Sequence, residues 1–121
     1  MDNAPRPIRF PVELDDALEH IRLLAHKRHG FFVDRRSTRR AMRKVAATPD
    51  MVWELVIQLS PADFHDGPLP DHHCPDREVW IFCPILDGRP MYLKIAFRRV
   101  QERSESALVI WSFHQPRFPM R

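Results

Sequence analysis

The stretch MYLKIAFRRV at residues 91–100 decides the fold class, because apolar side chains alternate along it with largely polar ones. A period of two predicts a β-strand that buries one face and exposes the other. This is the longest strand that the sequence predicts. The expected core face holds Leu93, Ile95 and Phe97, and the expected open face holds Tyr92, Lys94, Ala96 and Arg98.

Two further strands are expected beside it. Residues 78–83 and 107–114 also show a period of two, and turn residues separate the three segments at Asp87-Gly88 and at 102–106. The three strands should therefore form an antiparallel meander. On the last one, Val109, Trp111 and Phe113 are expected to face the core, which leaves Ser112 and His114 on the open face.

The residues before the sheet predict helices. Residues 12–29 have helical periodicity, and Gly30 ends the pattern. A brief strand at 31–33 leads to a second helix, capped by Asp34 or Ser37 and reaching Val45. The apolar stripe of the first helix consists of Leu14, Leu18, Ile21 and Ala25.

A third helix is expected to begin at Thr48-Pro49-Asp50, and one further turn at Ser60-Pro61. The proline-rich residues 67–75 predict a loop. This order, helices first and strands second, predicts an α+β fold with N-terminal helices packed on a C-terminal antiparallel sheet. The length of 121 residues favours one domain, with an extended arm at 1–11 and an irregular tail at 115–121.

Composition narrows the class of protein. Residues 107–116 form the longest run without Asp, Glu, Lys or Arg, and that run is too short to cross a membrane. The N-terminus lacks the apolar stretch of a signal peptide. We therefore expect a soluble, cytoplasmic protein with no membrane partner. In that compartment Cys74 and Cys83 are expected to be free thiols rather than a disulfide.

Positive charge is concentrated in one segment. The net charge is only +3, yet residues 35–44 contain six basic side chains and no acidic one. A concentrated basic patch on a nearly neutral protein favours a polyanionic partner, either nucleic acid or an acidic protein. The alternative is a helix face that is merely solvated. The basic residues are Arg35, Arg36, Arg39, Arg40, Arg43 and Lys44.

Reactive side chains collect on the expected open face of the sheet. If the last two strands pair as a hairpin, Tyr92, Lys94, Ser112 and His114 share that face. A phenol, an ammonium group and an imidazole can together bind a phosphate and move protons. The alternative is that these are ordinary surface residues.

Four segments, taken in order, resemble those of one family. They are LSPADF at 59–64, EVWI at 78–81, YLKI at 92–95 and VIWSFH at 109–114. Their order and spacing are similar to the MqsR family of type II toxins, over a span of residues 12–114. The resemblance implies a RelE-like fold and an endoribonuclease that cleaves messenger RNA without a metal or other cofactor, by attack of the RNA 2′-hydroxyl on the adjacent phosphate.

The resemblance also implies site residues and partners. Tyr92 falls at a family catalytic position, and His114 stands where the best-known members carry a catalytic Lys. The chain departs from the family in having Asp66 in place of a functional Lys and Arg77 in place of a Gln. The expected partners are mRNA and a cognate antitoxin protein. The catalytic candidates are Tyr92, His114, Arg77 and Lys94, and the RNA-binding candidates are Arg36, Arg39, Arg40, Arg43 and Arg98.

Two other functions stay open. A non-catalytic module on the same fold would use its basic helix to hold nucleic acid or an acidic partner. A zinc-dependent activity would use His65 and the run Asp71-His72-His73-Cys74. The spacing of that run matches no common zinc motif, so a loop with incidental histidines is the favoured interpretation.

Overall fold

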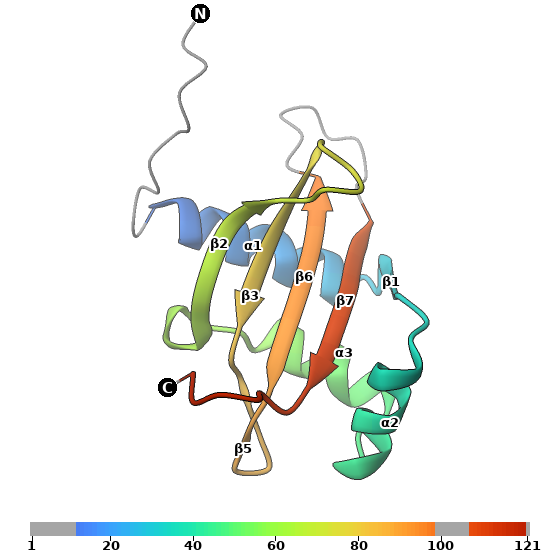
Figure 1. Cartoon of the computed structure of the whole chain (residues 1–121). Coiled ribbons are helices and arrows are strands. Elements are labelled where there is room, and N and C mark those ends of the chain that lie inside the picture. Colours follow the sequence, from blue (N-terminus) through green and yellow to red (C-terminus); the bar gives the residue numbers. More distant parts are fainter. Residues whose placement is uncertain (1–11, 99–106, 121) are drawn as a thin grey trace, which may run out of the picture.

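The computed structural model describes residues 12–98 and 107–120. These residues form three α-helices, a five-stranded sheet in the order β1-β7-β6-β3-β2 and a small β4-β5 ribbon (Figure 1). The expected α+β class is confirmed. The helices are α1 (Val12–His26), α2 (Arg36–Lys44) and α3 (Pro49–Ile57), with a short 3-10 helix η1 (Pro61–Asp63). The strands are β1 (Gly30–Phe32), β2 (Phe64–Pro70), β3 (Arg77–Phe82), β4 (Ile85–Leu86), β5 (Arg89–Pro90), β6 (Tyr92–Arg98) and β7 (Leu108–His114).

The main core lies between the helices and one face of the sheet. The predicted stripe of α1 is buried, and α1 packs against α3 behind the sheet (Figure 1). Leu93, Ile95 and Phe97 of β6 point into this core, as the alternation predicts. The expected arm at 1–11 and turn at 102–106 lie outside the described residues.

The N-terminal cap of α3 is the predicted one, whereas the predicted cap of α2 is not found. Thr48 caps α3 as expected, because its side-chain oxygen accepts the Met51 backbone N–H at 3.2 Å. Neither Asp34 nor Ser37 caps α2, so that prediction is wrong: the N-cap residue is Arg35, and its side chain makes no capping bond. Asp34 instead forms an ion pair with the Arg39 guanidinium.

The segment predicted as a loop at residues 67–75 is partly a strand, which corrects that prediction. Phe64–Pro70 form β2, which pairs antiparallel with β3 at the edge of the sheet. An edge strand tolerates Pro68 and Pro70, because one side of it needs no ladder hydrogen bonds. The pairing shifts register twice, so the strand lacks the clean period of two that would have revealed it.

A bulge in β7 changes the faces expected for the last strand. Lys94 pairs with Ser112 and Ile95 with Ile110, so Trp111 is the extra residue between them. Phe113 faces the core as expected, but Val109 and Trp111 lie on the open face, where they pack in a second small cluster with Val79 and Ala96. Val109 is buried as expected but on the opposite face, and Trp111 is only half-buried there, so the face predicted for both residues is wrong. Ser112 and His114 keep the open face that was predicted for them.

Close backbone contact brings β1 against β7. The two strands pair in parallel, with Gly30 opposite Leu108. A Cβ atom on Gly30 would lie 2.1 Å from the Leu108 carbonyl oxygen, so only glycine fits there. This pairing carries α2, which follows β1 in the chain, to the side of β7 (Figure 1). Within residues 12–98 and 107–120 no helix has both the length and the apolar character of a membrane span.

Candidate functional site

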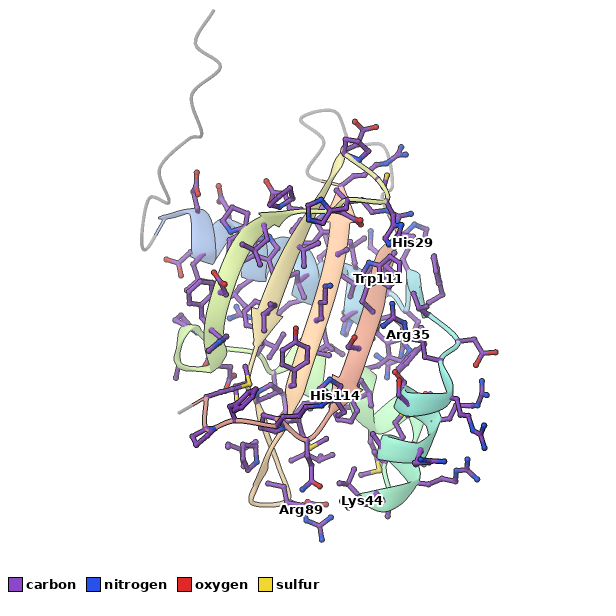
Figure 2. All side chains as sticks on the ribbon, in the orientation of Figure 1. His29, Arg35, Lys44, Arg89, Trp111 and His114 are labelled. Carbon is purple, nitrogen blue, oxygen red and sulfur yellow. The ribbon has the colours of Figure 1, made fainter. Side chains whose placement is uncertain are left out.

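The open face of the sheet lies between two crossing segments. The segment that follows β2 passes in front of β3 and β6 at one end, and the segment that follows β7 crosses in front of β6 at the other (Figure 1). Three hollows lie along this face beside β7, and neighbouring hollows share lining residues. Figure 2 shows Trp111, Arg35 and His114 on this side of the molecule.

Tyr92 and His114 form the centre of the site. They are direct partners in the β6–β7 register, and their rings stack with centroids 4.7 Å apart at an interplanar angle of 13°. His114 Nδ1 lies 2.8 Å from the Gln115 carbonyl oxygen. A carbonyl can only accept a hydrogen bond, so Nδ1 carries the proton. In the neutral ring, Nε2 is therefore free to accept a proton.

Tyr92 is held in its protonated form. Burial raises the pKa of its phenol above the usual 10.0, and the negative charge of Asp66 raises it further. The phenol lines a hollow of about 310 Å³ together with His65, His114 and residues 116–120. At neutral pH Tyr92 is thus a hydrogen-bond and proton donor, while the ring stacked on it offers an acceptor nitrogen.

Beside this pair lies a groove of about 440 Å³ between α2 and the end of β7, which we call the basic groove. His114 lines both this groove and the Tyr92 hollow, so the two are joined. Among the residues that the structure describes, no Asp or Glu lines the groove. Four cationic side chains surround a space of that size, which makes it suited to a polyanion. The cations are Arg35, Arg40, Lys44 and Arg117.

The basic side chains of α2 lie on two different sides of the helix. Ser37, Arg40, Ala41 and Lys44 line the groove, and their spacing of three, one and three places them on one side of α2. The other three arginine candidates on this helix do not line it, and at about 100° per residue they centre roughly a third of a turn away. One of these three is Arg39, which is paired with Asp34. The three are Arg36, Arg39 and Arg43.

A third and smaller hollow, of about 120 Å³, lies further along β7 and is called here the Trp111 hollow. The Arg35 guanidinium carbon lies 5.2 Å from the centre of the Trp111 ring. The His73 imidazole stacks on the same indole at 5.8 Å. Lys94 also lines this hollow, so its ammonium group stands beside the aromatic surface rather than in the Tyr92 hollow.

The sheet separates two of the predicted site residues from the rest. Arg77 and Arg98 are partners across β3 and β6 at the end of the sheet opposite to Tyr92. At roughly 3.3 Å per residue, the length of β6 places them about 20 Å from the Tyr92–His114 pair. Of the four catalytic candidates, the structure therefore brings Tyr92 and His114 together, places Lys94 nearby, and leaves Arg77 apart.

The histidines of the zinc hypothesis are also dispersed. His65 lines the Tyr92 hollow, whereas His72 and His73 line the Trp111 hollow. Within the part of the chain that the structure describes, no group of three or more His, Cys, Asp or Glu side chains is placed to hold a metal ion. Neither Cys74 nor Cys83 forms a disulfide.

A larger hollow, of about 580 Å³, lies elsewhere, between α3 and the β4-β5 ribbon. Of its described lining residues, three are acidic and one, Arg28, is cationic, and Arg28 is paired with Glu54 at 2.8 Å. Its charge is thus opposite to what a polyanion requires. The acidic residues are Asp50, Glu54 and Asp87.

Four residues of this face were not among the catalytic or RNA-binding candidates that the sequence predicts. Arg35 and Lys44 belong to the basic run, and the buried positions Thr38 and Met42 of α2 could have indicated which side of the helix meets the sheet. Trp111 was assigned to the core because the bulge leaves no mark in the sequence, and nothing around Arg117 points to a groove.

A scan against protein-family models finds no match to the chain, and searches of curated proteins and of solved structures find no significant match.

Proposed function

We propose that this protein is a metal-independent endoribonuclease that cleaves mRNA, with a RelE- or MqsR-like fold, and that it is the toxin of a type II toxin–antitoxin system. One observation carries the proposal: Tyr92 stacks on His114, and His114 also lines a groove whose described residues include four cations and no acid. Acid and base groups beside a phosphate-binding surface are what transesterification of RNA requires. The resemblance of four segments of the sequence to the MqsR family of toxins supports the same function.

The chemistry divides between the two rings. His114 Nε2 takes the proton from a ribose 2′-hydroxyl, and the 2′-oxygen forms a bond to the adjacent phosphorus. The bond from phosphorus to the 5′-oxygen breaks, and the Tyr92 phenol gives its proton to that leaving oxygen. The products are a 2′,3′-cyclic phosphate and a 5′-hydroxyl. An alkoxide is far more basic than a phenolate, so the raised pKa of Tyr92 does not prevent this transfer.

The groove cations bind the chain on either side of the cleaved phosphate. Arg35 and Arg40 present planar guanidinium groups, which contact phosphate oxygens in pairs. Lys44 and Arg117 add charge without base information. The same groove is suited to an acidic segment of an antitoxin protein, so we propose mRNA and a cognate antitoxin as the two partners.

One observation favours a second function, a non-catalytic module that binds RNA or an acidic partner. Asp66 lies close enough to Tyr92 to raise its pKa, and a negative charge there opposes an incoming phosphate. A module of this kind would bind RNA in the basic groove and leave it intact. Cleavage assays therefore separate the two functions.

Purified protein incubated with single-stranded RNA provides that assay. His114→Ala and Tyr92→Phe are each expected to lower the cleavage rate by about 10²-fold or more, as the loss of a general base or acid does. His26→Ala, an exposed histidine at the end of α1, is the matched control and should cleave normally. RNA that is bound but never cut by the wild-type protein would establish the non-catalytic module instead.

Two further readouts test the mechanism and the biological role. Cleavage should be unaffected by a chelator and should leave a 2′,3′-cyclic phosphate; loss of activity with chelator, or a 3′-hydroxyl product, would contradict the mechanism. Expression without an antitoxin should arrest growth, and the double variant Tyr92→Phe, His114→Ala should relieve the arrest. Equal arrest by the double variant at matched protein levels would disprove the assignment of these two residues.

A further inference from the structure

The Tyr92 hollow and the basic groove differ in character although they adjoin. The segment that crosses in front of β6 gives the hollow an apolar wall, formed by Pro116, Phe118, Pro119 and Met120 (Figure 1). Among the residues that the structure describes, Arg117 is the only Lys or Arg that lines the hollow, and no Asp or Glu lines it. An apolar hollow that opens onto a cationic groove suits a ligand with one apolar and one anionic part.

Phe118 leaves an aromatic surface uncovered at this hollow. Its side chain lines the hollow and is nevertheless 78% exposed, more than any other large apolar residue in the part of the chain that the structure describes. An aromatic ring that the rest of the protein leaves open provides a stacking face for a flat ligand. Covering such a ring also removes apolar surface from water, which favours binding.

Two residues connect the hollow to the groove. His114 and Arg117 line both spaces, so a ligand can extend from one into the other past these side chains. The Arg117 guanidinium supplies positive charge there, and such a group binds phosphate oxygens in pairs. Asp66 lies close enough to Tyr92 to act on it electrostatically, and its negative charge repels a phosphate but not an uncharged ring. The anionic part of the ligand therefore belongs at the junction and the flat part in the hollow.

We propose that the Tyr92 hollow is a subsite for one unpaired nucleobase of an RNA strand, stacked on Phe118, with the adjacent phosphate held by Arg117 beside His114. Its volume of about 310 Å³ is near the lower end of the range of small-molecule sites, roughly 300–1,000 Å³, and suits one base with its sugar. Every base has an aromatic face, so stacking alone accepts all four. The inference rests on RNA as the ligand of the proposed function, but it does not require cleavage.

RNA strands that carry phosphates but almost no bases test this subsite. The probe is a 2′-O-methyl strand of abasic nucleotides with one central adenine, and the reference is the wholly abasic strand of equal length and charge. Neither strand has the 2′-hydroxyl that cleavage needs. The adenine should tighten binding to the wild-type protein about fivefold or more, as stacking of one base on an aromatic side chain does.

Four proteins compared in the same assay assign the effect to Phe118. Phe118→Ala should abolish the gain from the adenine, and Phe118→Trp should keep it because it restores a stacking ring. Phe31→Ala is the matched control, since Phe31 is also exposed, at 50%, but belongs to β1 and lines neither the hollow nor the groove. Affinity for the wholly abasic strand should be the same in all four proteins, which shows that each variant keeps its groove and its fold.

The outcomes separate this inference from the proposed enzyme. No gain from the adenine in the wild-type protein, or a gain that Phe118→Ala keeps and Trp111→Leu removes, would overturn the subsite. Cleavage of ordinary RNA alongside either result would leave the proposed enzyme standing. A gain that depends on Phe118, without any cleavage of ordinary RNA, would refute the enzyme and leave the subsite standing.

Discussion

Two triple variants of equal charge decide whether RNA binds in the basic groove or on the outer side of α2. The groove variant is Arg40→Gln, Lys44→Gln and Arg117→Gln, three of the cations that line the hollow beside His114. The outer variant is Arg36→Gln, Arg39→Gln and Arg43→Gln, which the sequence also predicts to bind RNA but which do not line the hollow. Each variant removes three positive charges, so a difference between them reports position and not net charge.

The expected magnitude follows from counterion release. On single-stranded nucleic acid each phosphate contact contributes about 0.7 to the slope of log affinity against log salt. Losing three contacts should therefore reduce the slope by about 2. Between about 50 and 200 mM salt, wild-type affinity should then fall roughly 20-fold more than the affinity of the groove variant. The outer variant should keep nearly the wild-type slope, because its side chains lie away from the groove.

Fluorescence anisotropy of a labelled, uncleavable RNA measures both slopes directly. The outer variant also loses the exposed ion pair between Arg39 and Asp34, which contributes at most about 1 kcal/mol to stability and leaves the fold intact. Equal slopes for the two variants would show that binding depends on diffuse charge. A larger loss in the outer variant would place the RNA on the outer side of the helix and refute the argument from the groove.

Three other predictions concern the rest of the molecule. Tyr92 is the only tyrosine, so its phenolate absorbance should titrate above pH 10.0 in the native protein, and Asp66→Asn should lower the midpoint of that titration. Because the pKa of Tyr92 is higher in the native than in the unfolded chain, the free energy of unfolding should fall as the pH rises from 10 through the native pKa. A native midpoint at or below 10.0 would contradict the burial argument. Gly30→Ala should cost about 1–3 kcal/mol in urea denaturation, since its Cβ would meet the Leu108 carbonyl; an unchanged midpoint would mean that β1 moves freely. Thr48→Ala should cost about 1 kcal/mol by removing the cap of α3, whereas Ser37→Ala, which caps nothing, should be nearly neutral in the same assay.

The fold was predictable in the segments where apolar residues recur with one regular spacing. The helical spacing in α1 and the alternation in β6 each bury the side chains expected of them. β2 escaped prediction because an edge strand rich in proline needs only half of the ladder hydrogen bonds and shows no alternation. The bulge at Trp111 escaped for a related reason: one inserted residue reverses the facing of all residues before it, and the composition of the strand does not change.

The site was predictable only as far as strand pairing determines it. Tyr92 and His114 were expected on one face, and the β6–β7 register places them opposite each other. The distance of Arg98 from Tyr92 already follows from their six-residue separation on one predicted strand, at roughly 3.3 Å per residue. The position of Arg77 could not be predicted, because it depends on the register between β3 and β6. The groove cations Arg35 and Arg117 come from segments outside regular elements, which have no periodicity to predict from.

The parallel pairing of β1 with β7 determines when, during synthesis, the basic groove can first exist. β1 and α2 leave the ribosome early, but the strand that both of them pack against is the last strand of the described chain. Contacts between distant parts of a chain form late and slowly. One wall of the groove comes from α2 and the other from the end of β7, so an unfinished chain has no complete groove. Any polyanion that depends on this groove therefore has no complete binding surface until β7 has been synthesised and paired.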